Sequence, residues 1–438
     1  MRIKAAREAA SISSRLPAGT AMRTIVIRPA PRRRASLRLL VAAPHRLFFA
    51  GGMLQFALAS AWWCADVAAR HAGLFAPPAW AVPAPLAHPF LFQFTVFPFF
   101  MFGFLLTAVP SWTGVAVHAT TYKAAGLAMA VGVLGLDAGL AVGKAAFVLS
   151  GALYAAGWAL AIAELFRIVA ANRGRDRYAA GLAALMAVGW AGALAVTLSP
   201  LSPAWAAAGA WTVRVGGLWL FLLPVFLVVQ HRLIPFFSSR VIERYTLFRP
   251  RWSIPAVLAA CALHAALETA GAAAWLWVAD LPFSLWITYL ALRWGLAQSF
   301  RAKLLAMLHV SLAALAVGLA ASAAHSLAAA AGLAVAGHAP QHLVALGYLL
   351  SALLAMVSRV SLGHSGRALE ADSLTWRVFV AALAIALARA AADFPGLAAP
   401  WRAALLALTA LVLAALAAIW AWRYLPMYVQ PRADARRG

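Results

Sequence analysis

The residues best suited to chemistry in this sequence are its eleven histidines. Imidazole is the commonest metal ligand in proteins and suits iron and copper. Most of these histidines lie in or beside long apolar stretches, where an ionisable side chain is costly and indicates a functional site. We interpret them as candidate ligands of a metal or of a metal-containing cofactor.

The histidines are expected in two layers, one near each end of the predicted helices. The outer layer comprises His71, His88, His325, His338 and His342, and the inner layer His45, His118, His231, His309 and His364. His88 and His342 each begin a helix at one depth, so the pair could ligate a haem iron axially from facing helices. A second site would come from His45, His231, His309 and His364.

Direct metal ligation is predicted for four of these side chains: His88, His342, His309 and His231. His264 stands apart near the middle of a predicted helix, with Glu268 four residues later on the same face. The alternative for any single histidine is a structural role, in which the ring hydrogen-bonds a backbone carbonyl or faces lipid headgroups.

The elements that carry these histidines are predicted to be membrane-spanning helices. Of the 438 residues, 65% are hydrophobic and only 11% are charged, against about 25% charged in soluble proteins. A span needs about 20 apolar residues, and that window predicts about twelve. The expected spans are 47–68, 88–109, 117–137, 144–168, 179–199, 205–231, 253–276, 280–298, 303–325, 340–359, 374–393 and 402–425. The fold class is therefore an all-α polytopic bundle.

Charge supports both the number of spans and their orientation. Most of the 36 Lys and Arg residues fall in alternate connections, as they do on cytoplasmic loops. Both termini are then cytoplasmic, as in a multi-pass inner-membrane protein surrounded by lipid. The net charge of +24 is explained by these loops, so nucleic acid is not an expected partner. We expect a disordered basic tail at 1–38, a transmembrane domain at 39–428 and a basic tail at 429–438.

Other chemistries find little support in the sequence. Cys64 and Cys261 are far apart and form no CxxC or zinc spacing, and no phosphate-binding loop is present. A secondary transporter or permease of twelve spans, with structural histidines, is the alternative function. A proton-driven transporter usually needs carboxylates within the membrane, and Asp137, Glu164 and Glu268 are among the few acidic residues near the apolar parts of the first ten spans.

Three stretches of the sequence resemble the NnrS family of bacterial membrane proteins. Residues 103–114 read GFLLTAVPSWTG and are similar to the family's GFLLTAVPNWTG. Residues 342–347 read HLVALG, and residues 358–367 read SRVSLGHSGR, which resembles TRVTLGHTGR. Weaker matches are PHRLFF at 44–49, LIPFF at 233–237 and Leu308-His309. The order and spacing fit across almost the whole chain.

This resemblance implies twelve membrane helices, bound haem b and copper, and a role in resistance to nitric oxide, often beside denitrification. By motif, His342, Arg359, His364 and Arg367 carry over as cofactor-binding residues, followed by His45, His231 and His309. The family's WHAHEM stretch is HPFLF here, so only His88 remains of its two histidines. Haem with copper and haem alone are therefore both open, and the implied small molecule is nitric oxide or a related species.

Overall fold

The computed structural model describes residues 35–333 and 337–434, and every regular element among them is helical. Ala35–Gly438 form one compact unit. Of the predicted N-terminal tail, only residues 35–38 are described. Ser36 accepts a hydrogen bond from the backbone N–H of Arg38 and so caps a short 3-10 helix, η2 (Leu37–Leu39). The prediction of disorder for the rest of that tail falls outside the described residues.

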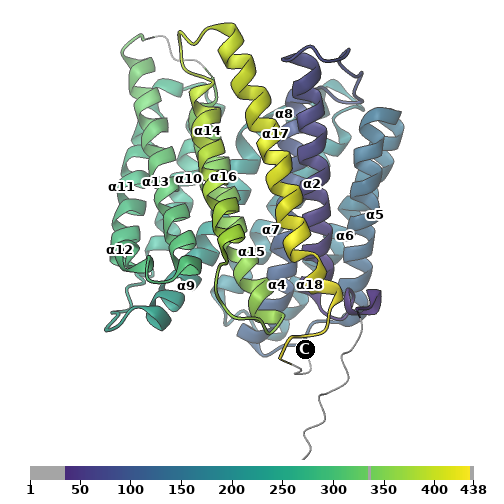
Figure 1. Ribbon diagram of the computed structural model, residues 1–438, viewed down its shortest axis with the longest axis vertical. Helices are drawn as coiled ribbons and strands as arrows, with labels where there is room; N and C mark the ends of the chain where they lie inside the picture. Colours follow the sequence, from purple (N-terminus) through teal and green to yellow (C-terminus); the bar gives the residue numbers. More distant parts are fainter. Residues whose placement is uncertain (1–34, 334–336, 435–438) are drawn as a thin grey trace, which may run out of the picture. The chain divides into compact units, whose positions relative to one another are not determined.

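In the described part of the chain, eleven helical segments are long and apolar enough to cross a membrane. They run side by side along one bundle (Figure 1). The segments are Pro44–Arg70 (α2), Ala84–Thr113 (α3, η3 and α4), Ala119–Val142 (α5), Lys144–Ala171 (α6), Arg177–Leu198 (α7), Pro203–Val241 (α8, η4 and α9), Ala273–Arg293 (η5 and α11), Lys303–Ala330 (α13), Ala339–His364 (α14, η6 and α15), Ser373–Ala391 (α16) and Ala399–Val429 (α17 and α18). The predicted all-α polytopic fold is confirmed, and the chain is a multi-pass membrane protein.

The seventh predicted span is shorter than expected. The sequence predicts a helix over 253–276, whereas α10 ends at Thr269 and has 17 residues. Gly271 adopts φ 71° just after that end, a left-handed conformation that glycine adopts without strain and that commonly terminates a helix. The chain then makes a short 3-10 turn, η5 (Ala273–Trp275), before α11 (Trp277–Arg293) begins. Apolar composition alone could not show this break.

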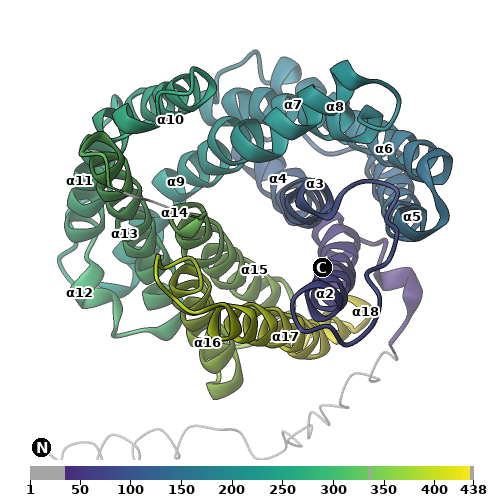
Figure 2. The same cartoon turned by 90° about the horizontal axis from the view of Figure 1, so that it is seen from above.

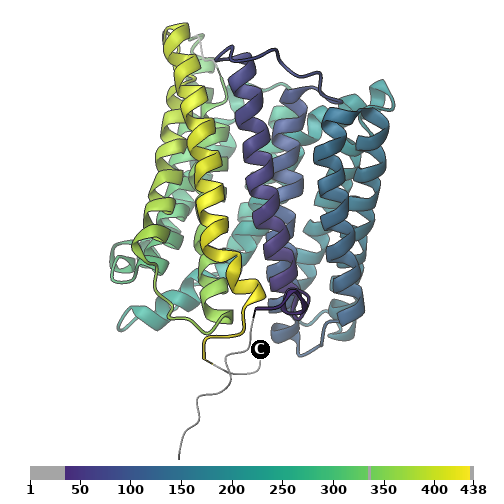
Figure 3. The same cartoon turned by 45° about the vertical axis from the view of Figure 1, so that its right-hand side comes forward.

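The two ends of the bundle are distinguished by the residues they carry. Helix α2 begins at Pro44 and α17 ends at Tyr424 on the same end (Figures 1 and 3), which we call the terminal face. The opposite end, where α2 finishes at Arg70 and α14 (Ala339–His342) begins, is the far face. That the terminal face is cytoplasmic stays a prediction from the distribution of Lys and Arg.

Three of the spans are interrupted by π-helix. The segments are η3 (Leu91–Val96) between α3 (Ala84–Phe90) and α4 (Phe97–Thr113), η4 (Thr212–Leu222) between α8 (Pro203–Trp211) and α9 (Leu223–Val241), and η6 (Leu343–Leu350) between α14 and α15 (Ser351–His364). These three spans are the most deeply buried of the eleven. Figure 2 shows α4, α9 and α15 nearer the centre than α5, α11 and α16. Since π-helical turns occur frequently at functional sites, they direct attention to this central group.

Side chains from neighbouring helices satisfy polar groups in the π-helical spans. Gln93 in η3 donates to the carbonyl of Val213 in η4 at 3.1 Å, and the Tyr154 hydroxyl donates to the carbonyl of Phe94 at 2.7 Å. In lipid, an unsatisfied backbone carbonyl costs several kcal/mol, so these contacts stabilise the irregular turns. They also join η3 directly to η4 and to α6.

Small residues allow the closest helix contacts. At Gly157 in α6, an added Cβ would lie 2.7 Å from the backbone nitrogen of Met129 in α5. Such a contact leaves no room for a side chain and lets the two backbones approach closely. The α5–α6 hairpin packs at the side of the central group, with its terminal-face end beside α2.

Candidate metal and cofactor sites

The structure places His88 and His342 near each other at the far face. His88 lies in α3 and His342 ends α14, so each stands just before a π-helical segment. The two imidazoles interact electrostatically, and both also interact with Arg389 of α16. Facing histidines on two helices are the arrangement by which helix bundles hold a metal-containing cofactor.

Local contacts leave a nitrogen available on each imidazole of this pair. His342 Nδ1 lies 2.9 Å from the carbonyl oxygen of His338, so Nδ1 carries the hydrogen and Nε2 keeps its lone pair. This is the contact that fixes the tautomer of many metal-ligating histidines. The ring of His88 stacks on Trp63 with 3.8 Å between centroids, and its buried Nδ1 has no hydrogen-bond partner among the described residues.

A second histidine pair lies at the terminal face. His45 begins α2 and His364 ends α15, and their ring centroids are 4.3 Å apart with an angle of 36° between the planes. His45 is buried, and its Nδ1 has no hydrogen-bond partner within the described part of the chain. Residues separated by more than 300 positions in sequence therefore place two imidazoles side by side.

Three arginines surround this second pair. Arg46 Nη1 donates to the carbonyls of Tyr428 and Gln430, both at 2.9 Å. Arg432 donates to the carbonyl of His364 at 3.0 Å, and Arg367 donates to the side chain of Gln430 at 2.9 Å. These hydrogen bonds hold the C-terminal segment against the start of α2 and the end of α15, the two helices that carry the histidines.

Charge at this face is only partly neutralised. Hydrogen bonding to the carboxylate of Asp434 raises the pKa of Arg432. Burial lowers the pKa of Arg367, and the positive charge of Arg423 lowers it further. The buried Nη1 of Arg367 has no hydrogen-bond partner among residues 35–333 and 337–434, so this guanidinium retains a donor for an anionic group.

The other two histidines predicted for the second site, His231 and His309, do not join this pair. His231 of α9 lies 3.0 Å, through Nδ1, from the hydroxyl of Tyr178, and His309 of α13 lies 2.9 Å, through Nε2, from the hydroxyl of Ser238. Their remaining ring nitrogens are buried without a hydrogen-bond partner in the described chain. The four histidines predicted for a second site thus separate into one pair and two individual side chains, and across the described residues no three His, Cys, Asp or Glu gather to hold a metal ion.

Arg359 has a different environment from the other predicted arginine. Its guanidinium lies over the ring of Phe237, 3.9 Å from the centroid, in a cation–π contact. The SRVSLGHSGR stretch at the end of α15 therefore contacts the LIPFF stretch of α9, at 233–237, through Arg359 and Phe237. Arg359 and Arg367 remain candidates for binding a cofactor's acidic groups, with Arg367 nearer the histidine pair.

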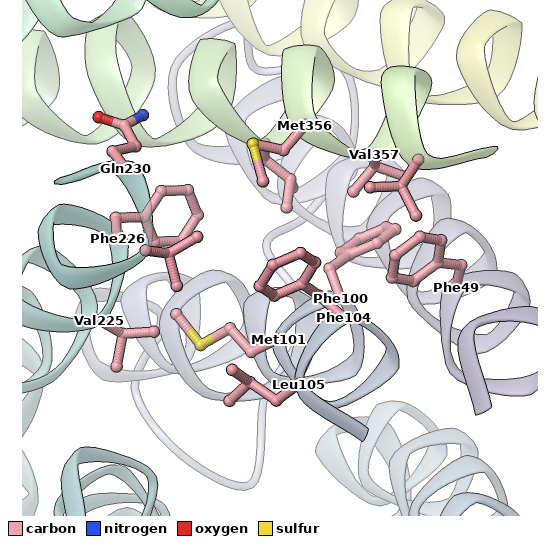
Figure 4. A pocket seen from close by; sticks show the side chains of 13 residues that line it. Phe49, Phe100, Met101, Phe104, Leu105, Val225, Phe226, Gln230, Met356 and Val357 are labelled. Atoms are coloured by element: carbon pink, nitrogen blue, oxygen red, sulfur yellow. The ribbon is translucent and has the colours of Figure 1, made fainter. Parts of the chain in front are cut away.

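A small apolar cavity lies among α2, α4, α9 and α15 (Figure 4). Its volume is about 50 Å³. Since about 10–15 Å³ of such space holds one water molecule, the cavity has room for a small molecule of a few atoms. Figure 4 shows Met101 and Met356 among side chains pointing into it. The lining includes Phe49, Phe100, Phe226 and Gln230.

The cavity lies close to several of the candidate histidines. His45 is one helical turn before Phe49, and His231 follows Gln230 directly. Gln230 also accepts a hydrogen bond from the hydroxyl of Tyr348 in η6, at 3.0 Å. The contact attaches two π-interrupted spans to each other at the wall of the cavity.

Sequence reasoning missed several polar residues of these sites. Arg46 follows His45 directly in PHRLFF, which was a usable signal. Arg432 and Gln430 lie in a segment that reads as a basic tail, so their role depends on the path of the chain. Gln230 lies in an apolar run, and its contact with Tyr348 joins segments that are far apart in the sequence.

Comparison with known proteins agrees with this arrangement. The sequence matches the family described as NnrS protein over residues 39–432. The chain belongs to the NnrS family. A search of curated proteins gives no match. The NnrS match includes the helices of both histidine pairs and reaches Arg432, so the C-terminal segment at the terminal face is part of the family's shared domain.

Proposed function

We propose that this chain is an NnrS-type metalloprotein of the bacterial inner membrane that binds haem b, and copper, and acts in nitric oxide resistance or metabolism. The observation that carries the proposal is the His88–His342 pair on two π-interrupted helices. Its chemistry fits an iron ligand, because His342 Nδ1 is held by a carbonyl and Nε2 is left with a lone pair.

We assign different roles to the residues at the two faces of the bundle. His88 and His342 would hold the haem iron at the far face. The His45–His364 pair, with rings 4.3 Å apart, would hold copper, for which imidazole is a suitable ligand. At the terminal face, the free donor of Arg367 would bind an anionic group by a charge-assisted hydrogen bond. His231 and His309 remain predicted metal ligands, each with one free ring nitrogen.

The cavity supports nitric oxide as the small molecule. Nitric oxide has two atoms and little polarity, and the cavity of about 50 Å³ is almost entirely apolar. An apolar cavity of the protein interior stays dry and admits apolar guests. When bound, haem iron supplies a redox-active centre with affinity for nitric oxide. The protein's own side chains exclude water and retain the guest within the bundle.

The experiment is the absorption spectrum of detergent-purified protein expressed with haem supply. We expect a Soret band, α and β bands that change with dithionite, and haem loss in His342→Ala. The matched control is His71→Ala, an exposed histidine at the same face, which should retain haem. A colourless protein free of iron and copper would refute the proposal. Unchanged haem content in His342→Ala would remove this residue as a ligand.

A further inference from the structure

A buried group of ionisable residues lies apart from both histidine pairs. His264 of α10 is 2% exposed and Asp280 of α11 is fully buried. The side chain of Glu268, one turn after His264, is 16% exposed. His264 Nδ1 lies 2.7 Å from Asp280 Oδ1, and His264 Nε2 lies 3.3 Å from Glu268 Oε2. Two carboxylates therefore face the two nitrogens of a single ring.

Hydrogen bonding fixes the state of one side of this ring. The hydroxyl of Ser322 donates to Asp280 Oδ2 at 2.6 Å, so Asp280 accepts hydrogen bonds through both oxygens. His264 Nδ1 must then carry a hydrogen. In a neutral imidazole, Nε2 would be left with a lone pair.

The other side of the ring is incomplete without an added positive charge. His264 Nε2 and Glu268 Oε2 are both buried and make no hydrogen bond within the described residues. A nitrogen lone pair and a carboxylate oxygen at this separation repel each other, and low dielectric strengthens that repulsion. A proton or a metal cation placed between the two atoms removes it.

The surroundings favour a proton. Zinc and calcium sites use four or more ligands, and no group of three His, Cys, Asp or Glu side chains that could hold a metal ion exists in the described chain. Trp219 of η4 stacks on the imidazole with 3.4 Å between ring centroids, and an indole face attracts a cation. A protonated His264 would be stabilised by the carboxylates of Asp280 and Glu268 and by the face of the Trp219 ring.

The groups facing His264 are few. Cys261 on α10 is the other titratable side chain nearby, and it interacts electrostatically with Asp280. Ser322 from α13 and Trp219 from η4 are uncharged. Among the ion pairs of the described residues, His264 is the one cation-forming partner of either carboxylate. Glu268 is partly exposed near the far-face end of α10.

We propose that Glu268, His264 and Asp280 form a proton-binding site that exchanges its proton with the far face of the bundle. A proton from water binds the Glu268 carboxylate and passes to His264 Nε2. The resulting imidazolium is paired with the Asp280 carboxylate, and the proton leaves by the reverse path. No bond to carbon changes and no electron moves.

Protonatable side chains continue from this site toward the cavity. Cys261 interacts electrostatically with Asp280 and with Tyr348. Tyr348 donates its hydroxyl hydrogen to Gln230, which lines the cavity. The proposal holds whether or not haem is bound.

The test is infrared spectroscopy of the full-length protein in detergent, recorded across a pH series in H₂O and D₂O. We expect one titrating carboxyl–imidazole signal that shifts in D₂O and is lost in both Glu268→Gln and His264→Gln. Glu370→Gln, at an exposed residue after α15, is the matched control and should keep the signal. Circular dichroism establishes that each variant is folded.

Two outcomes would overturn the proposal. One is a signal that persists unchanged in folded Glu268→Gln protein. The other is a stoichiometric metal, measured by elemental analysis of wild-type protein, that is lost in His264→Gln, because a metal cation would then occupy the gap. If a variant fails to fold, the spectrum of the wild-type protein tests the proposal by itself. The absence of any titrating signal that shifts in D₂O would rule out the proton-binding site.

Discussion

Replacing Arg46 with alanine should destabilise the bundle more than any other single change at the terminal face. The Arg46 guanidinium donates to two backbone carbonyls of the C-terminal segment, both at 2.9 Å, and the residue is 7% exposed. A hydrogen bond from a charged group contributes about 1.5–3 kcal/mol. Because the two bonds share one guanidinium and lie near solvent, we expect a loss of about 3 kcal/mol. Arg46→Lys keeps the charge, but its differently shaped side chain does not place a nitrogen where Nη1 lies, and it should lose about half as much.

The assay is equilibrium unfolding in mixed detergent micelles, followed by the fluorescence of the 18 tryptophans. Arg38→Ala is the matched control, because Arg38 is exposed at the same face and its side chain makes no hydrogen bond with the residues that the structure describes. If Arg46→Ala unfolds at the same detergent composition as Arg38→Ala, the C-terminal segment does not stabilise the bundle through Arg46, and the reasoning is wrong.

Three further predictions concern packing, charge and the cavity. Gly157→Leu should cost more than about 2 kcal/mol of unfolding free energy by overpacking against α5, whereas Gly181→Leu, with open space at its Cβ, should cost little. Burial alone would raise the pKa of Asp372, but hydrogen bonds, first that from the Thr375 backbone N–H, outweigh it and lower the pKa below the ordinary 3.8. The stabilisation that ionised Asp372 contributes is therefore complete above pH 3.8 and is lost as the pH falls through the lower pKa of the folded protein. In melting experiments across a pH series, Asp372→Asn should reduce this loss of stability at acid pH. Met356→Trp should fill the cavity and abolish xenon binding measured by xenon NMR.

Helix content and the approximate positions of the spans followed from composition because lipid demands it. A span must satisfy its own backbone and present apolar side chains, so a window of about 20 apolar residues locates it. The window failed at α10, where Gly271 with φ 71° ends the helix early. It also could not distinguish α-helix from π-helix in η3, η4 and η6, since the two share the same apolar composition.

Candidate ligands were visible in the sequence because an ionisable side chain is energetically unfavourable in a membrane. On that ground we predicted His88, His342, His45 and His364. Their pairing was only partly visible. His88 with His342 followed from equal depth along two helices, which is a one-dimensional property. His45 with His364, and the separation of both from His231 and His309, depended on which helices are neighbours around the bundle.

The sequence by itself determined that this protein is a histidine-bearing membrane bundle of the NnrS family, since apolar run length, charge alternation and local motifs are all read along one chain. Only the tertiary structure decided which nitrogens are free. That depends on contacts such as His231 with Tyr178 and His264 with Asp280. Lateral packing of helices and the rotation of each helix about its axis set these contacts, and neither is encoded in a local stretch of residues.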